Sequence, residues 1–180
     1  MGVTNPQFPA ENCPQGDCAS LSCNPEPDLN DSGAAVAAFA DFMTFLAPPP
    51  RGPVNVAAIL GEFQFLKIGC ASCHVSTLRT GASSVDALDR VTFHPYSDFL
   101  LHDMGSLGDG ITQNRATGRL MRTAPLWGVR KLTTLLHDGR ATSLDQAIRA
   151  HDGQGRKARD RFVNLSAWER AQLIAFLNSL

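Results

Sequence analysis

The segment Cys70-Ala71-Ser72-Cys73-His74 combines two thiols and an imidazole at a spacing that suits one kind of chemistry. Cys-x-x-Cys-His is the attachment signature of a c-type haem, because each thiol can add across one vinyl group of the porphyrin. The small residues between the cysteines fit the tight helical turn that brings both sulfurs to one edge of the ring. His74 can then place its imidazole beneath the iron as the proximal ligand. The motif predicts one covalent haem c bound by Cys70, Cys73 and His74.

Three other chemistries use similar side chains. A thioredoxin-like dithiol requires a strand before the motif, whereas the preceding residues 57–68 have a helical period. A structural zinc site requires a second Cys/His pair, but no cysteine follows Cys73 and the later histidines are scattered. A Cys70–Cys73 disulfide gives no role to His74. A zinc- or disulfide-stapled binding module is therefore kept only as a third hypothesis.

The composition limits the class of protein. The chain has 180 residues, enough for one domain with a core and a short appendage. Its 16 basic and 17 acidic residues balance, so we expect no nucleic-acid partner. The chain has no run of about 18 apolar residues, which is the length needed to span a membrane. Haem c is attached outside the cytoplasm, so we expect a periplasmic or otherwise exported protein. Residues 1–10 are no signal peptide, and we expect the chain to be part of a longer precursor.

Residues 1–30 are predicted to form an irregular segment ahead of a cytochrome c-type domain at 31–180. Cys13, Cys18 and Cys23 lie at equal intervals, and we expect one pair of them to form a disulfide, without being able to say which. Residues 28–33 resemble the start of a calcium loop, but Phe39 stands where the bidentate glutamate belongs. A helix N-cap at Asp31 or Ser32 is the favoured interpretation.

Helical periods appear on both sides of the motif. One helix is predicted to run to about residue 47 and a second from 54 to 68, separated by three prolines. Two more are predicted to close the chain, one over 143–151 and one from Ser166, whose partner Glu169 completes a capping box. Between them, residues 75–140 hold short apolar pieces, among them Trp127, that suit loops wrapping a flat apolar cofactor. The sequence predicts an all-α, cytochrome c-like fold.

The ligand on the other face of the iron has two candidates from the sequence. Leu144, Ala147, Ile148 and His151 lie on one face of the predicted helix, so His151 points at a buried surface where it needs a partner. Met104 lies about 30 residues after the haem motif, and a methionine further along the chain is a common ligand in small cytochromes. We favour His151 and keep Met104 as the alternative, with an open site as the third option.

The chain as a whole resembles the C-terminal haem domain of the di-haem oxidoreductases, relatives of the bacterial di-haem cytochrome c peroxidases. The similarity covers roughly residues 45–180 and rests on several segments in one order. These are residues 46–50, 69–81, 95–105, 122–128, 136–141 and 168–180. The resemblance implies that His151 occupies the place of the distal ligand, usually a methionine. It also implies an upstream second haem, yet this sequence contains a single Cys-x-x-Cys-His.

The other polar candidates have weaker support. Arg122 could hold a haem propionate through charge-assisted hydrogen bonds, and Arg79 is a lesser case. His102 and His137 each precede an aspartate, and we expect them to stabilise turns rather than bind metal. His94 is expected to be structural or exposed.

These observations predict electron transfer through one covalent haem c, as the relay domain of a di-haem oxidoreductase, with no catalytic residue assigned. Its partner would be a redox protein or the upstream haem domain. The alternative is a peroxidase-like enzyme that reduces hydrogen peroxide at an open or labile haem site. The sequence leaves the choice to what lies opposite His74, because a haem with both axial positions filled has no site for a substrate.

Overall fold

The computed structural model describes residues 4–10 and 28–180. Contacts divide the chain into two compact units, residues 1–47 and residues 48–180. The boundary predicted near residue 30 stays a prediction. The three N-terminal cysteines, and the disulfide expected among them, lie outside the described residues.

The first unit contains helix α1, Ala34–Phe45, and none of the helix residues is buried. The N-cap is Gly33 rather than Asp31 or Ser32, and no side chain accepts a capping hydrogen bond. The Asp31 carboxylate instead accepts a hydrogen bond from the Gly33 N–H at 2.6 Å. The predicted apolar face of this helix is exposed, with Phe39 at 70% and Met43 at 65%.

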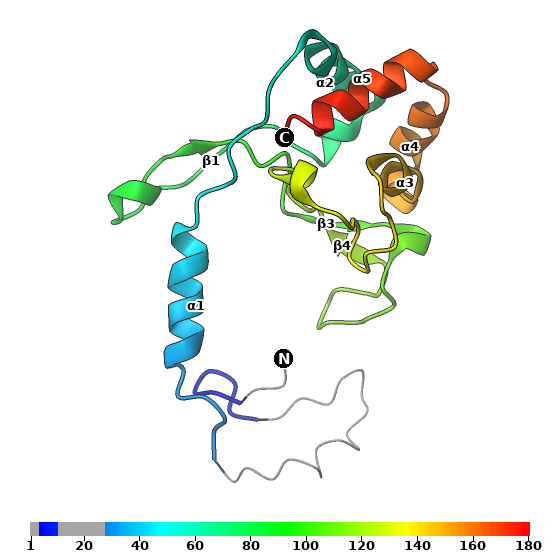
Figure 1. Cartoon of the computed structure of the whole chain (residues 1–180). Coiled ribbons are helices and arrows are strands. Elements are labelled where there is room, and N and C mark those ends of the chain that lie inside the picture. The colour runs from blue at the N-terminus through cyan, green and yellow to red at the C-terminus, as the bar shows by residue number, and fades with distance from the viewer. Residues whose placement is uncertain (1–3, 11–27) are drawn as a thin grey trace. The chain divides into compact units, whose positions relative to one another are not determined.

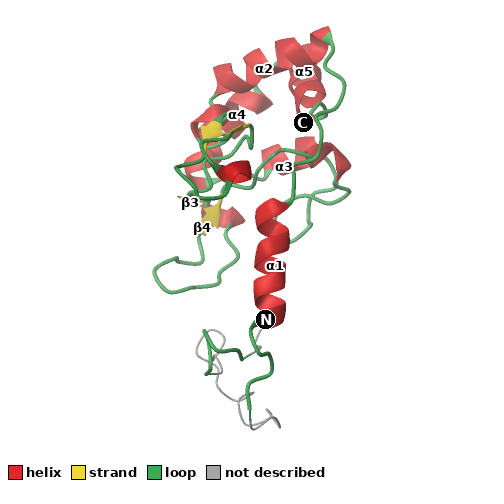
Figure 2. Ribbon diagram, turned by 90° about the vertical axis from the view of Figure 1, so that its left-hand side faces the viewer, coloured by secondary structure: helices red, strands yellow, loops and turns green. Residues whose placement is uncertain are grey.

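The second unit is built around two helices that lie side by side in Figures 1 and 2, α2 at Val56–Ile68 and α5 at Ala167–Leu177. Asn55 caps α2 by accepting a hydrogen bond from the Ala58 N–H. Ser166 and Glu169 form the predicted capping box of α5, which is confirmed. Helix α5 therefore begins where the sequence predicted, because its start signal is local, whereas α2 begins two residues later than predicted.

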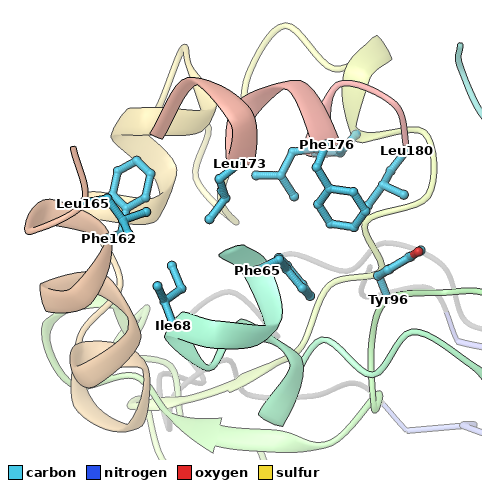
Figure 3. Close-up of a cluster of buried hydrophobic side chains, with 10 residues drawn as sticks. Phe65, Ile68, Tyr96, Phe162, Leu165, Leu173, Phe176 and Leu180 are labelled. Atoms are coloured by element: carbon cyan, nitrogen blue, oxygen red, sulfur yellow. The ribbon is translucent and has the colours of Figure 1, made fainter. Parts of the chain in front are cut away.

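The core of this unit lies between α2, α5 and the segment before α5. Figure 3 shows Phe65 and Ile68 of α2 facing Leu173 and Phe176 of α5, with Phe162 and Leu165 at one end and Tyr96 at the other. Phe162, Leu173 and Phe176 have no exposed surface. The core therefore holds the C-terminal end of α2, which is the end that leads into the Cys-x-x-Cys-His segment.

Two shorter helices lie between the loops and α5. Helix α3 spans Leu144–Arg149, so it ends two residues earlier than predicted, and it is capped by Ser143. Helix α4, Arg156–Val163, was not predicted at all. Its sequence, Arg-Lys-Ala-Arg-Asp-Arg-Phe-Val, has only three apolar residues among five charged ones. Only Phe162 of this helix is buried, so the core contact that holds it could not be read from a pattern.

Residues 75–140 contain four short strands and several single-turn 3₁₀ helices. Strand β1 (Leu78–Arg79) pairs antiparallel with β2 (Thr92–Phe93), and β3 (Leu101–Asp103) pairs antiparallel with β4 (Leu120–Arg122). The 3₁₀ turns of this segment are Asp86–Leu88, Gly105–Leu107 and Val129–Lys131. Two more lie outside it, at Cys70–Ser72 and Gly153–Gly155. Strands of two or three residues are too short to show an alternating pattern.

The all-α prediction is therefore wrong. Helices make up 41% and strands 10% of the described structure, with two small antiparallel sheets. The physical reason is that the long loops fold back on themselves and pair their backbone groups, since unpaired backbone polar groups would be costly next to a core. No helix in the described ranges is long and apolar enough to cross a membrane.

Candidate functional site

The Cys-x-x-Cys-His segment is placed by the end of α2. Gly69 ends the helix in a left-handed conformation with φ of 97°, and the chain turns at once into the 3₁₀ turn Cys70–Ser72. The Cys70 carbonyl accepts hydrogen bonds from the N–H groups of Cys73 at 3.3 Å and His74 at 3.0 Å. The two thiols and the imidazole therefore belong to one tight turn at the edge of the core.

Both cysteines of the motif are free thiols rather than a disulfide. Burial raises the pKa of the Cys70 thiol to about 12 and raises that of Cys73 as well. Reactive dithiols work with a thiolate whose pKa is lowered by nearby positive charge or a helix N-terminus. The environment here does the opposite, which argues against a thioredoxin-like role for this pair.

The His74 ring is oriented by a backbone carbonyl. Its Nδ1 lies 2.9 Å from the carbonyl oxygen of Tyr96, and Tyr96 itself has a left-handed backbone with φ of 50°. A carbonyl can only accept, so Nδ1 must carry the proton and Nε2 keeps its lone pair. Burial lowers the pKa of His74 to about 4, so the ring is neutral near pH 7. This is the tautomer and charge of a metal-binding histidine.

His151 is held in the same way. Its Nδ1 lies 2.8 Å from the carbonyl oxygen of Ala147, so the proton is again on Nδ1 and Nε2 is free to bind. Burial lowers its pKa, which keeps this ring neutral too. The two ring centroids lie 6.5 Å apart, with the planes tilted by 52°. Metal–imidazole bonds are about 2.0–2.1 Å long, so two rings that bind one metal from opposite sides have centres roughly 6 Å apart.

These residues fit the group that the motif predicts. Two thiols sit on one turn, and two neutral imidazoles from distant segments are spaced for one metal atom between them. Each imidazole also has the carbonyl partner that commonly fixes the ring of a metal-binding histidine. The structure therefore brings His74 and His151 together, although 77 positions separate them in the sequence.

Met104 lies close to His151. A Cβ at Gly155 would lie 3.2 Å from the Met104 methyl carbon and 3.2 Å from His151 Cδ2. Both side chains that the sequence offered as the second ligand therefore meet at one backbone position. The choice of ligand between them stays a prediction.

A second group of ligand atoms lies beside Cys73. The His102 Nε2 is 2.8 Å from an Asp98 carboxylate oxygen, and its Nδ1 is 3.2 Å from the Gln154 amide oxygen and 3.8 Å from Cys73 Sγ. Within the described part of the chain, Cys73, Asp98 and His102 form one cluster with metal-ligating atoms. Because Asp98 and His102 already bind each other, we interpret this cluster as a set of contacts that stabilises the loops around the motif.

The other sequence candidates make contacts of their own. Trp127 packs against Phe93 and Phe99, each at 6.2 Å between ring centroids, and Arg122 is exposed at the end of β4. Their cofactor roles stay predictions. The remaining side chains make local contacts: Arg79 with the Arg90 carbonyl, His94 with Thr77 and His137 with Asp138.

Several residues around the site were missed by sequence reasoning. The carbonyls of Tyr96 and Ala147 orient the two histidines, and Asp98, Asp152 and Gln154 bind the loops next to them. Backbone carbonyls leave no signal in a sequence. For Asp152 a signal was present in the sequence, because this residue directly follows the favoured ligand His151.

The chain matches the model of a protein family over its whole length. Its description is "Di-haem oxidoreductase, putative peroxidase", and the match spans residues 1–180. The chain belongs to this family, which confirms the resemblance found in the sequence. Membership implies haem binding and a redox function of the oxidoreductase, peroxidase-like kind. No curated protein and no solved structure matches the chain.

Proposed function

We propose that this chain transfers electrons through one haem c, attached to Cys70 and Cys73 and held between His74 and His151. The observation that carries the proposal is the pair of neutral imidazoles, with ring centroids 6.5 Å apart and each Nδ1 bound to a carbonyl. When bound, the haem iron supplies one-electron redox chemistry. With both axial positions taken by protein, a peroxide or other substrate has no place to bind.

The residues around the pair support this role through contacts that hold both histidine segments in place. The motif turn is anchored to the core through Ile68 and Phe65, and Phe65 also lies 6.3 Å from the His74 ring. Arg159 donates a hydrogen bond to the His151 carbonyl at 3.0 Å, and Arg161 donates one to the Ile68 carbonyl at 3.2 Å. Ligands held by such contacts should change little in position between the two oxidation states, which favours fast electron transfer.

Covalent haem attachment also supports export of the protein, with a redox protein or an upstream haem domain of the same family as partner. The single Cys-x-x-Cys-His in the sequence supports one haem for this chain. A peroxidase activity would require an open or labile axial position, and the His74–His151 pair argues against one.

The test uses protein made in a haem-attaching host. After denaturation in acid organic solvent, the chain mass should include one haem; haem that extracts freely contradicts the attachment. The ferric protein should be low-spin without the Met-to-iron charge-transfer band. His151→Ala should turn it high-spin, while Met104→Ala should leave it low-spin. The reverse pattern assigns Met104, and a high-spin wild-type protein that reacts with peroxide favours the enzyme.

A further inference from the structure

Asp152 is a buried carboxylate that joins three segments around the distal side of the site. The residue is 9% exposed. One carboxylate oxygen accepts hydrogen bonds from the Ser106 backbone N–H at 3.1 Å and from the Ser106 hydroxyl at 2.8 Å. The other accepts one from Arg156 at 2.7 Å and lies 3.6 Å from Arg159. The Asp152 carboxylate, which directly follows His151, thus connects the 103–106 loop to the first residue of helix α4.

The loop and the residues after His151 also fit closely together. A Cβ at Gly105 would lie 2.7 Å from an Asp152 carboxylate oxygen, and one at Gly153 would overlap the Asp103 carbonyl oxygen. Gln154 accepts a hydrogen bond from the Asp103 N–H at 3.0 Å. Both glycines have left-handed backbones, with φ of 57° and 53°. The 103–106 loop therefore cannot shift relative to residues 152–154 without breaking these contacts.

This close fit restricts the position of Met104, because Met104 lies inside the 103–106 loop. The Met104 methyl group and the His151 ring meet at Gly155, so two side chains able to bind haem iron lie side by side. An axial position takes only one of them. His151 has its Nδ1 bound to Ala147 and its carbonyl bound to Arg159, whereas the loop fixes the backbone of Met104 through its neighbours.

We propose that Asp152 is a positioning residue that selects His151 over Met104 as the distal ligand, by locking the 103–106 loop to the start of α4. The proposal rests on the His151 assignment made above. Arg159 connects His151 to Asp152, because its guanidinium donates a hydrogen bond to the His151 carbonyl and also lies near the Asp152 carboxylate.

The experiment compares Asp152→Ala with Asp145→Ala in the haem-loaded chain. Asp145 also binds an arginine four residues later, at 2.6 Å, but it touches no part of the loop. In Asp152→Ala the loop loses its hydrogen bonds to the start of α4, and Met104 should then compete for the iron. The Met-to-iron band should then appear and the midpoint potential should rise, because methionine ligation raises it. Asp145→Ala should keep the wild-type spectrum and potential.

Two further variants keep the test decisive. Asp152→Asn keeps the size of the side chain and answers the question if Asp152→Ala does not fold; it should show a weaker form of the same change. Adding Met104→Leu to either variant should remove the new band. Wild-type spectrum and potential in both Asp152 variants overturn the proposal, even where His151→Ala turns high-spin. A wild-type Met band, by contrast, overturns the His151 assignment and the proposal with it.

Discussion

At the scale of single residues, Tyr96 shows how one position serves both core and site. Its ring packs against Phe65 at 6.1 Å and Phe176 at 5.6 Å between centroids, and its hydroxyl donates a hydrogen bond to Glu62 at 3.2 Å. Its backbone, with φ of 50°, directs its carbonyl at His74. The side chain therefore stabilises the core, while the main chain orients the proximal ligand.

This division predicts different outcomes for two substitutions at Tyr96. Tyr96→Phe removes one hydrogen bond and should lower the free energy of unfolding by about 1 kcal/mol, with the haem spectrum unchanged. Tyr96→Ala also removes the buried ring and should cost about 3–5 kcal/mol, as for other large aromatic truncations. Urea denaturation followed by circular dichroism measures both. A Tyr96→Phe variant with altered ligation would contradict the assignment of the carbonyl as the orienting group.

At the scale of elements, the crossing of α2 and α5 depends on Gly61. A Cβ at this position would overlap the Gln172 carbonyl oxygen and lie 2.8 Å from Phe176 Cβ. The two helices approach so closely that only a hydrogen fits between them. Since α2 ends at the haem motif, this crossing also sets where Cys70 and His74 lie relative to the core.

Gly61→Ala should therefore destabilise the protein although alanine is the better helix former. Overpacking of this kind costs about 1–3 kcal/mol, more than the ~1 kcal/mol gained in helix propensity. Gly81→Ala is the matched control, because a Cβ there would meet nothing within 4 Å and its φ is not left-handed. The control should be neutral or slightly stabilising. Equal unfolding free energies for the two variants in urea would show that the helices can separate without cost.

At the scale of the whole molecule, the near-neutral net charge conceals two oppositely charged units. All 16 Lys and Arg lie in residues 48–180 together with 11 Asp and Glu, which gives that unit a net charge of +5. Residues 1–47 carry six acidic residues and no basic one. A positive haem unit favours encounter with acidic redox partners, through attraction that salt screens.

Because Cys70, Cys73, His74, His151 and Met104 all lie in the second unit, residues 48–180 should suffice for the haem site. We expect this fragment, produced in a haem-attaching host, to show the same oxidised and reduced spectra as the full chain. Unlike the full chain, it should bind a cation exchanger at neutral pH. A high-spin fragment would mean that residues 1–47 supply something the site needs.

Much of the architecture followed from local sequence. The Cys-x-x-Cys-His segment, the helix before it and the Ser166–Glu169 capping box depend on residues within a few positions of one another, and both helices form as predicted. The family followed from several motifs in one order. Helix α4 and the four strands could not be predicted from the sequence. Helix α4 is held by one buried phenylalanine, and the strands are only two or three residues long.

The pairing of His74 with His151 was decided by the tertiary structure. The helical pattern marked His151 as a buried histidine, but only the fold shows its ring 6.5 Å from that of His74, with Met104 beside it. The groups that orient these side chains are the carbonyls of Tyr96 and Ala147 and the carboxylate of Asp152. Carbonyls are common to every residue, and the partners of Asp152 come from separate segments, so their roles arise only when the chain brings them together.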